Sequence, residues 1–340
     1  MSRNHAQPVP PETIVAEPTG ARLKIGLARG IGRGLRGFLW IAKILVPVSL
    51  AVALLDWTGW LYLLEPVFRP VMGLINLPPQ AALPILTALL SSFYAAFAMM
   101  LVIPFTSAQL VLLAIFISIA HMFFIEGTIQ HKAGINGPAM VGVRLVVACL
   151  TVIIVSWFFD GTSTPVVMPQ DITARASIEA AVSAWAVSTL KLLLKMLLIM
   201  VPAMTVLEMM KVFNWTERVA RVFRPLMVVL GLSPNVAAMW VAGTFFGIIY
   251  GSALIVEEST SGRYEPDELK RLHIALGLNH SIVEDPAMFL AAGIGLFWTV
   301  VPRFLASIAA VHLYRLWRLF HTRLRTPDVI PADRPRPEPR

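Results

Sequence analysis

The chain has 340 residues, of which 57% are hydrophobic and 14% are charged, and its mean hydropathy is +0.72. Soluble domains average about 45–50% apolar and about 25% charged residues, so the composition excludes two ordinary soluble domains and indicates that lipid is the solvent for much of the surface. The net charge of +8 does not indicate a nucleic-acid partner, because the basic residues flank apolar segments, and the single cysteine, Cys149, excludes an internal disulfide and a cysteine-based metal site.

Apolar segments of about the length that crosses a bilayer recur along the chain. Residues 1–36 form a polar and then basic tail, and residues 321–340 form a Pro- and Arg-rich tail that we expect to be disordered. Residues 61–74 and 219–232 mix apolar residues with arginines, which is typical of amphipathic helices at the membrane interface. The candidate spans are residues 38–55, 81–103, 110–125, 139–159, 190–207, 236–256, 273–290 and 294–313. We therefore expect an all-α polytopic membrane protein.

The chain contains an internal repeat. A shift of 155 residues places Val-Phe-Arg-Pro at residues 67–70 on the same four residues at 222–225, and eight of the sixteen positions in 67–82 are identical. Beyond a longer polar loop the shift becomes 159, which places His121, Glu126 and Arg144 on His280, Asp285 and Arg303. Shared apolar composition would match Leu and Val rather than these polar residues in order. The membrane part is therefore predicted to be two homologous repeats, residues 37–160 and 181–320, joined by a polar connection at 161–180.

The placement of charges indicates how the repeats are oriented. Lys and Arg are in excess before the first span and after the last, so both termini are expected in the cytoplasm of a bacterial cell, with the protein in its inner membrane. The central connection and residues 257–271 are richer in acids and are expected outside. An odd number of crossings per repeat follows, although each repeat has four apolar segments.

This conflict is resolved if one segment of each repeat does not cross the membrane. Residues 110–127 and 273–286 are the candidates, because each has a His, an acid and then a helix breaker. Broken or re-entrant segments are tolerated only where they line a cavity or are buried in protein. The repeats are then inverted, and the interrupted segments indicate a transporter binding site. The alternative is eight full spans in two parallel halves.

A second-half stretch carries the most polar side chains within apolar sequence. Its candidate binding residues are Asn279, His280, Glu284 and Asp285. We expect His280 and Glu284 to lie one helical turn apart on a shared face, where the carboxylate orients or charges the imidazole. Asp285 before a proline is expected to cap the next helix. Buried carboxylates are costly unless they are paired, protonated or bound to metal, so the stretch is either a functional site or a structural cluster with Arg303 as counter-ion.

The first-half counterparts are His121 and Glu126, which are five residues apart and share a helix face less well. Their half is poorer in polar groups, so a site dominated by the second half is expected. Arg144 and Arg303 each lie near the start of the last span of a repeat. Each needs a carboxylate or carbonyl groups if it is buried. We expect Arg144 to pair with Glu126, and Arg303 with Glu284 or Asp285.

The sequence leaves a metal site open. Imidazole and carboxylate ligands suit iron, manganese or zinc, but the zincin spacing of two histidines around a glutamate is missing. His273 lies two helical turns before His280 and is a candidate to approach the same face. A membrane hydrolase is disfavoured, because Ser281 beside His280 is not a nucleophile motif and Gly-x-Ser-x-Gly does not occur.

Small residues recur every four positions in both repeats. Gly243, Gly247 and Gly251 form such a stripe, and Ala88, Ser92 and Ala96 repeat it. Stripes of this kind let helices approach closely in lipid, so we expect them to pack the two halves together, with the lining of a substrate path as the alternative.

The stretch His280-x-x-x-Glu284-Asp285, the following Gly293, the span with Arg303 and the Phe-Arg-Pro helix before a Gly-rich span resemble bacterial membrane proteins of the nucleoside-recognition "Gate" class. Gate regions also occur in concentrative nucleoside transporters, in ferrous-iron transporters and in spore-maturation membrane proteins. The resemblance is clearest over residues 219–313 and fainter over 64–157. It implies a pore-like or transport-like role.

The residues and the resemblance together predict a transporter or permease-like protein for a small, nucleoside-like solute or an ion, with a polar midplane site. We expect it to be coupled to an ion gradient because no ATP motif is present. No cofactor or nucleic acid is expected, and a homo-oligomer or a partner membrane protein remains open. The alternatives are a non-transporting membrane component that acts through a partner protein, as the spore-maturation resemblance implies, divalent metal transport, and an intramembrane metal-dependent enzyme.

Overall fold

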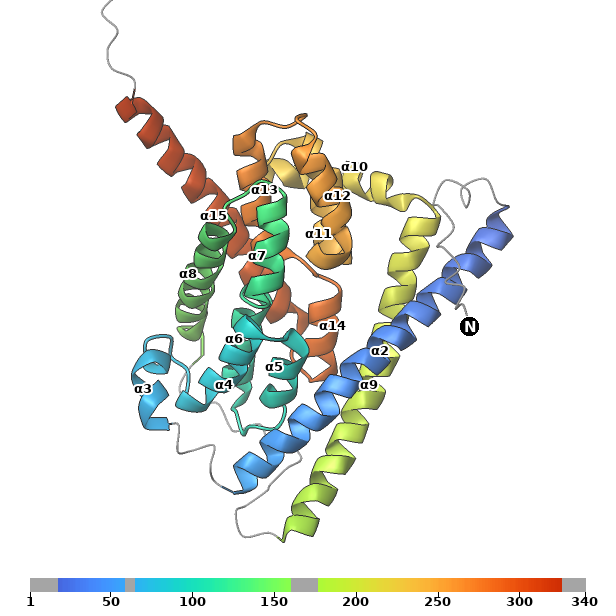
Figure 1. Ribbon diagram of the computed structural model, residues 1–340, viewed down its shortest axis with the longest axis vertical. Helices are drawn as coiled ribbons and strands as arrows, with labels where there is room; N and C mark the ends of the chain where they lie inside the picture. Colours follow the sequence, from blue (N-terminus) through green and yellow to red (C-terminus); the bar gives the residue numbers. More distant parts are fainter. Residues whose placement is uncertain (1–17, 59–64, 160–176, 326–340) are drawn as a thin grey trace, which may run out of the picture.

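The computed structural model describes residues 18–58, 65–159 and 177–325, and these residues form helices and loops with no strand among them (Figure 1). The outer parts of both predicted tails and most of the central connection lie outside this range. The first helix begins at Thr19 and the last ends at Arg325, so both extend into the predicted tails. The described residues include five helical segments long and apolar enough to cross a membrane, which are Thr19–Leu55, Ser107–Lys132, Gly137–Ser156, Ile178–Val212 and Leu296–His321. The predicted all-α polytopic membrane protein is confirmed.

The order of the helices repeats along the chain. The first half comprises α2 (Thr19–Trp57), α3 (Glu65–Gly73), the 3-10 turn η2 (Pro79–Ala81), α4 (Ala82–Leu90), α5 (Phe93–Met100), α6 (Ser107–Ile119), α7 (Phe123–Lys132) and α8 (Gly137–Ser156). The second half comprises α9 (Ile178–Val212), α10 (Trp215–Val229), η3 (Pro234–Val236), α11 (Ala237–Phe246), α12 (Ile248–Thr260), α13 (Pro266–Asn279), α14 (Glu284–Ala291) and α15 (Leu296–Arg325). Each element has its counterpart, and the turns η2 and η3 are 155 residues apart, as the sequence repeat requires.

The long helices α2 and α9 lie side by side and run in opposite directions (Figure 1). Near one end the guanidinium of Arg22 donates to the carbonyl of Val212. Near the other, the indole of Trp185 donates to the hydroxyl of Ser49 at 3.1 Å. Because residue numbers rise along α2 as they fall along α9, the equivalent helices are antiparallel. The predicted inverted repeat is therefore present.

Each repeat contains a helical hairpin formed by two short helices, α4–α5 in the first and α11–α12 in the second. The Thr87 hydroxyl lies 3.4 Å from the Met99 sulfur, and a Cβ at Gly243 would lie 3.1 Å from Ile255 Cδ1. Twelve residues of continuous helix would separate each pair by about 18 Å, so the chain must reverse. The prediction of single spans at 81–103 and 236–256 is wrong.

The segments expected not to cross instead continue in one direction through a break. Helix α15 packs antiparallel to both α13 and α14, because Arg303 contacts Asp285 while Tyr314, further along, contacts Asp267 at the start of α13. The breaks in α6–α7 and α13–α14 are as predicted, but their assignment as the re-entrant segments is wrong. The hairpins are the parts of the repeat that turn back.

The breaks occur at equivalent residues of the two repeats. Met122 and Ser281 are 159 residues apart, and both have left-handed φ values, of 49° and 52°. An L-residue adopts this region only when the surrounding contacts hold it there. The backbone N–H groups next to these breaks bond to the hairpins, from Met122 to Ala88 O and from Ile282 to Thr244 O, both at 2.8 Å. Each hairpin is thus hydrogen-bonded to the backbone at the helix break of its own repeat.

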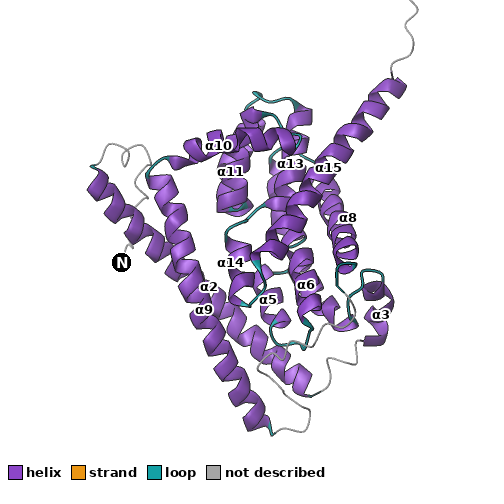
Figure 2. Ribbon diagram, turned by 180° about the vertical axis from the view of Figure 1, so that it is seen from behind, coloured by secondary structure: helices purple, strands orange, loops and turns teal. Residues whose placement is uncertain are grey.

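The amphipathic helices α3 and α10 lie at opposite ends of the molecule (Figures 1 and 2). Each leaves apolar residues exposed, including Val67 and Val71 on α3 and Val222 and Val228 on α10. This arrangement fits the predicted interfacial helices and follows from the inversion of the repeat.

The acidic loop at residues 257–271 lies at the same end as the C-terminal part of α15. The hydroxyl of Tyr314 donates to Asp267 at 3.1 Å, and the guanidinium of Arg271 donates to the Gly231 carbonyl at the end of α10 at 2.8 Å. The expectation that this loop and the C-terminus face opposite sides is wrong. The hairpin α11–α12 returns the chain to the side it came from, and excess acids are a weak topology signal.

Candidate functional site

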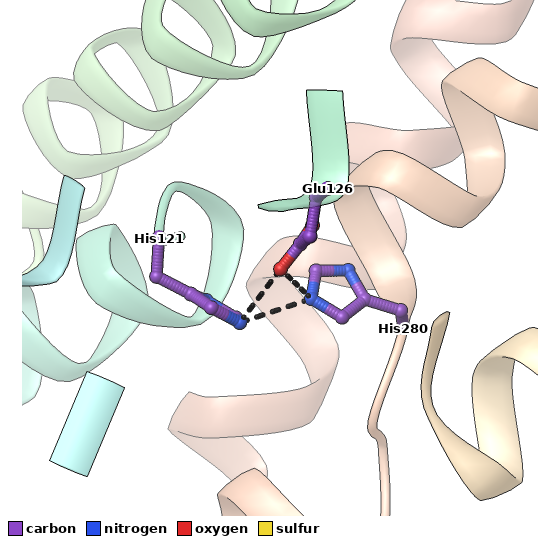
Figure 3. Close-up of side chains that lie close together, drawn as sticks. All are labelled: His121, Glu126 and His280. Atoms are coloured by element: carbon purple, nitrogen blue, oxygen red, sulfur yellow. Dashed lines mark hydrogen bonds and ion pairs between the residues drawn. The ribbon is translucent and has the colours of Figure 1, made fainter. Parts of the chain in front are cut away.

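Three ionisable side chains from the two repeats point at one another in the centre of the molecule (Figure 3). The Nε2 atoms of His121 and His280 are 3.0 Å apart, and Glu126 Oε1 lies 3.1 Å from each of them. None of the three residues is more than 3% exposed. The structure therefore joins residues that lie 159 positions apart in the sequence, at the place where the two broken helices meet.

The helix breaks orient both imidazoles. His121 follows the end of α6 and His280 follows the end of α13, so each ring reaches back along its helix to a carbonyl four residues earlier. His121 Nδ1 lies 2.7 Å from Ile117 O, and His280 Nδ1 lies 3.1 Å from Leu276 O. Because a carbonyl oxygen only accepts, both Nδ1 atoms must carry the proton that is donated. The Nε2 atoms are left to face each other.

Arg144 of α8 fixes the first-half carboxylate. Its Nη1 atom lies 2.7 Å from Glu126 Oε2, and both side chains are buried. Its remaining donors bond to the carbonyls of Ile119 and His121, each at 3.0 Å. These carbonyls have no partner within α6 because the helix ends there. The predicted pairing of Arg144 with Glu126 is thus present in the structure.

Arg303 of α15 plays the equivalent part in the second half. Its Nη1 atom lies 3.3 Å from Asp285 Oδ2, and its Nε donates to Asn279 Oδ1 at 3.1 Å. Its Nη2 donates to the carbonyl of His280. Of the two carboxylates considered for Arg303, the structure selects Asp285.

Glu284 does not lie on a common helix face with His280. Helix α13 ends at Asn279, His280 is extended, and α14 begins at Glu284, so helical spacing does not apply between the two residues. The Glu284 carboxylate instead accepts from the hydroxyl of Tyr94, on α5 of the other repeat, at 2.5 Å. Asp285 is not a cap either, because Val283 is at the N-cap of α14 and Asp285 pairs with Arg303.

A cavity of about 360 Å³ opens beside the cluster. Its walls combine the three clustered residues with aromatic and further acidic side chains from both repeats. The lining residues are Trp40, Phe93, Tyr94, His121, Met122, Ile125, Glu126, Gly247, His280, Ser281, Glu284 and Asp285. Phe93 and Tyr94 begin α5, and Gly247 joins α11 to α12, so both hairpin tips reach the cavity. The cavity is therefore enclosed by broken helices, hairpin tips and the middle of α2.

The small-residue stripes do not run along continuous helices. Gly247, with a φ of 81°, ends α11, so Gly243 and Gly251 lie on different arms of a hairpin. A Cβ at Gly243 would lie 2.7 Å from Leu276, and one at Gly247 would lie 2.7 Å from Ser281. Both neighbours belong to the same repeat, so the expectation that these two glycines pack the halves together is wrong. In the first repeat Ser92 likewise sits between the two arms, where it caps α5.

Close packing of the halves relies on other glycines. A Cβ at Gly30 or Gly34 of α2 would lie 2.5 or 2.8 Å from the backbone of α9, and a Cβ at Gly277 would lie 3.3 Å from Arg144. The sequence did not indicate the first two, because residues 1–36 were expected to form a basic tail, whereas α2 already begins at Thr19.

The structure adds one residue to the site and removes one candidate from it. Tyr94 was not predicted, since it stands at an apolar position of the repeat where the second half has Ile249. His273 was a candidate for the face of His280, but its Nε2 atom lies 3.3 Å from Ser259 Oγ and it is not part of the cluster.

No protein-family model and no solved structure matches the chain. The chain is similar to the uncharacterized membrane protein YvoD of Bacillus subtilis strain 168, with 27% identity over 310 residues, which cover 87% of this chain and 96% of the relative. The likeness therefore extends beyond either repeat alone. It supports a membrane protein and names no substrate.

Proposed function

We propose that the chain is a secondary transporter of a small polar solute or ion in the bacterial inner membrane, with both termini in the cytoplasm. The observation that carries the proposal is the meeting of two inverted, interrupted helices at a buried cluster of charged and polar side chains. Paired interrupted helices in inverted halves form the midplane binding sites of many secondary transporters. Ionisable groups at that depth are expensive and are retained mainly for function.

The cavity supports a polar organic solute of nucleoside size, which is the substrate class that the Gate resemblance implies. Its volume of about 360 Å³ lies within the range of small-molecule sites, about 300–1,000 Å³. Trp40, Phe93 and Tyr94 offer aromatic faces for a planar ring. Glu284 and Asp285 offer carboxylate oxygens to hydroxyl or amino groups. The same wall therefore combines stacking surface with directed hydrogen bonds.

The two hairpins supply the elements that could alternate access to the cavity. Their tips reach it from opposite repeats, and Tyr94 at one tip is bonded to Glu284 across the interface between the repeats. Opening one hairpin breaks contacts on one side only, because the equivalent hairpins enter from opposite ends. A cation gradient is the proposed energy source, as the sequence contains no ATP motif.

Uptake into proteoliposomes tests the proposal. Purified protein is reconstituted, and uptake of labelled nucleosides, organic ions and divalent metals is measured with and without proton or sodium gradients. We expect gradient-dependent uptake of one class, reduced at least tenfold in Glu284→Gln because the negative charge of one cavity carboxylate is lost and the hydrogen bond from Tyr94 is no longer charge-assisted. Glu258→Gln, on the acidic loop away from the cavity, is the matched control and should retain uptake.

Absence of uptake for the whole panel by folded wild-type protein would overturn the proposal. A stoichiometric co-purifying membrane subunit together with that result would favour the non-transporting alternative.

A further inference from the structure

We infer that His121, His280 and Glu126 bind one divalent transition-metal ion, of the zinc class, at the junction of the two repeats. The claim concerns metal binding and goes beyond the proposed transport. It starts from the three atoms that converge in Figure 3: His121 Nε2, His280 Nε2 and Glu126 Oε1, all within 3.1 Å of one another.

All three atoms present lone pairs when the imidazoles are neutral. Each Nδ1 donates to a backbone carbonyl, at Ile117 or Leu276, so the neutral ring carries its lone pair on Nε2. A carboxylate oxygen is also an acceptor. Three acceptors buried together without a cation would repel one another and leave polar groups unsatisfied. The site therefore requires a positive charge among them.

The geometry favours a metal ion over a shared proton. A proton bridges two atoms along a line, whereas these three atoms form a nearly equilateral triangle with sides of 3.0, 3.1 and 3.1 Å. In tetrahedral sites with metal–ligand distances of about 2.0–2.1 Å, neighbouring ligand atoms are about 3.3 Å apart. The observed triangle is slightly smaller than that arrangement, so a metal ion fits if the three atoms move apart by a few tenths of an ångström.

The surroundings have the form of a metal second shell. Ligand histidines usually donate their other N–H to a carbonyl or carboxylate, and ligand carboxylates are themselves hydrogen-bonded. The first feature is present, because each Nδ1 bonds to a carbonyl, and the carboxylate is held by an ion pair in which Glu126 Oε2 lies 2.7 Å from Arg144 Nη1. The second oxygen of Glu126 is thereby engaged, which leaves Oε1 as the ligand atom.

The donor set indicates both the metal class and an open coordination position. Two imidazoles and one carboxylate suit zinc, iron(II) and manganese(II). All three residues line the cavity, so the fourth position of a tetrahedral ion is available to water or to a polar group of a solute. Glu284 on the same wall adds negative charge near the ion. Since the ligands come from both repeats, the ion would also tie the halves together.

Co²⁺ is the probe that tests the site, because tetrahedral Co²⁺ absorbs visible light far more strongly than the hydrated ion. Metal-free purified protein is titrated with Co²⁺ and then with Zn²⁺, and the bound metal is counted by mass spectrometry after desalting. We expect about one ion per chain, with Zn²⁺ displacing Co²⁺. His280→Gln and Glu126→Gln should each weaken binding at least 100-fold, since each removes a ligand.

Two further variants separate ligand loss from misfolding. His273→Gln removes a buried histidine outside the cluster and should bind Co²⁺ as the wild type does. His280→Cys replaces one ligand with another and should bind Co²⁺ with an added thiolate charge-transfer band. Folded wild-type protein that binds neither ion, or equal loss in His273→Gln and His280→Gln, would overturn the inference. Because binding is read in detergent and transport in liposomes, failure of one proposal is distinguishable from failure of the other.

Discussion

Arg144 and Arg303 each satisfy two needs of a broken transmembrane helix. Each neutralises a buried carboxylate, Glu126 or Asp285, and each donates to carbonyl groups that the break leaves without helical partners. A lone carboxylate at this depth would be strongly unfavourable. The charge, its counter-ion and the break are therefore interdependent, and none is expected to persist without the others.

We predict that Arg144→Gln destabilises the protein by about 3–5 kcal/mol, because it leaves Glu126 buried without a cation. The melting temperature of purified protein in detergent reports this loss. Combining it with Glu126→Gln should restore part of the stability, since the unpaired charge is removed together with its partner. Arg224→Gln on the exposed face of α10 is the control and should melt like the wild type. Equal melting of Arg144→Gln and Arg224→Gln would contradict the pairing.

The sequence predicted the charged pairs better than the histidine cluster. The sequence paired Arg144 with Glu126, and Arg303 with Glu284 or Asp285, because each acid lies on the helix just before that of its arginine, and the structure contains the Glu126 and Asp285 pairs. The contact between His121 and His280 joins two repeats and depends on how the halves meet. The expected His280–Glu284 face failed because helical periodicity assumes an unbroken helix, whereas the chain is extended at His280.

At the scale of the elements, the full spans and the re-entrant segments were predicted the wrong way round. The predicted full spans are hairpins, and the predicted re-entrant segments are broken helices that continue in one direction. Residues 81–103 and 236–256 are apolar enough to look like complete spans, and hydropathy does not detect the reversal at Ser92 or Gly247. The breaks at His121 and His280 were visible, because ionisable residues and helix breakers stand there. Whether a chain continues or turns back after a break is set by packing against other helices, which composition does not encode.

The tip of the second hairpin gives a prediction at this scale. Gly247 has φ 81° and ψ 154°, a backbone conformation that is essentially restricted to glycine. Gly247→Ala should destabilise the protein by more than the strain cost of about 1–3 kcal/mol, because its Cβ would also lie 2.7 Å from Ser281 Oγ. Gly262→Ala is matched, since Gly262 has a φ of 75° and open space around it. We expect a lower melting temperature for Gly247→Ala than for Gly262→Ala, and reduced Co²⁺ affinity only for Gly247→Ala. Identical behaviour of the two variants would show that the contact with Ser281 is unimportant.

Across the whole molecule, the inverted repeats bring basic residues to one end. The start of α2, the arginine-containing helix α10 and the end of α15 lie toward the same end, and α3 lies at the other (Figures 1 and 2). Repeat matching and the terminal charges together anticipated this inversion. The acidic loop at 257–271 was misplaced, because its side is decided by the hairpin before it rather than by its charge.

The side of that loop distinguishes the structure from the charge pattern, so it is the sharpest test of the topology. We predict that, in a Cys149→Ala background, a membrane-impermeant maleimide labels Glu179→Cys in intact cells but labels Ser261→Cys and Asn136→Cys only after permeabilisation. All three positions are exposed, so unequal labelling reports the side of the membrane rather than burial.

The expected labelling follows from the course of the chain. Helix α9 separates Glu179 from α10, and the hairpin α11–α12 returns the chain to the side of α10 before Ser261. We expect that side in the cytoplasm because Lys and Arg are in excess around α10. Equal labelling of Glu179→Cys and Ser261→Cys in intact cells would require the hairpin to cross the membrane, and the inverted arrangement of the repeats would then fail.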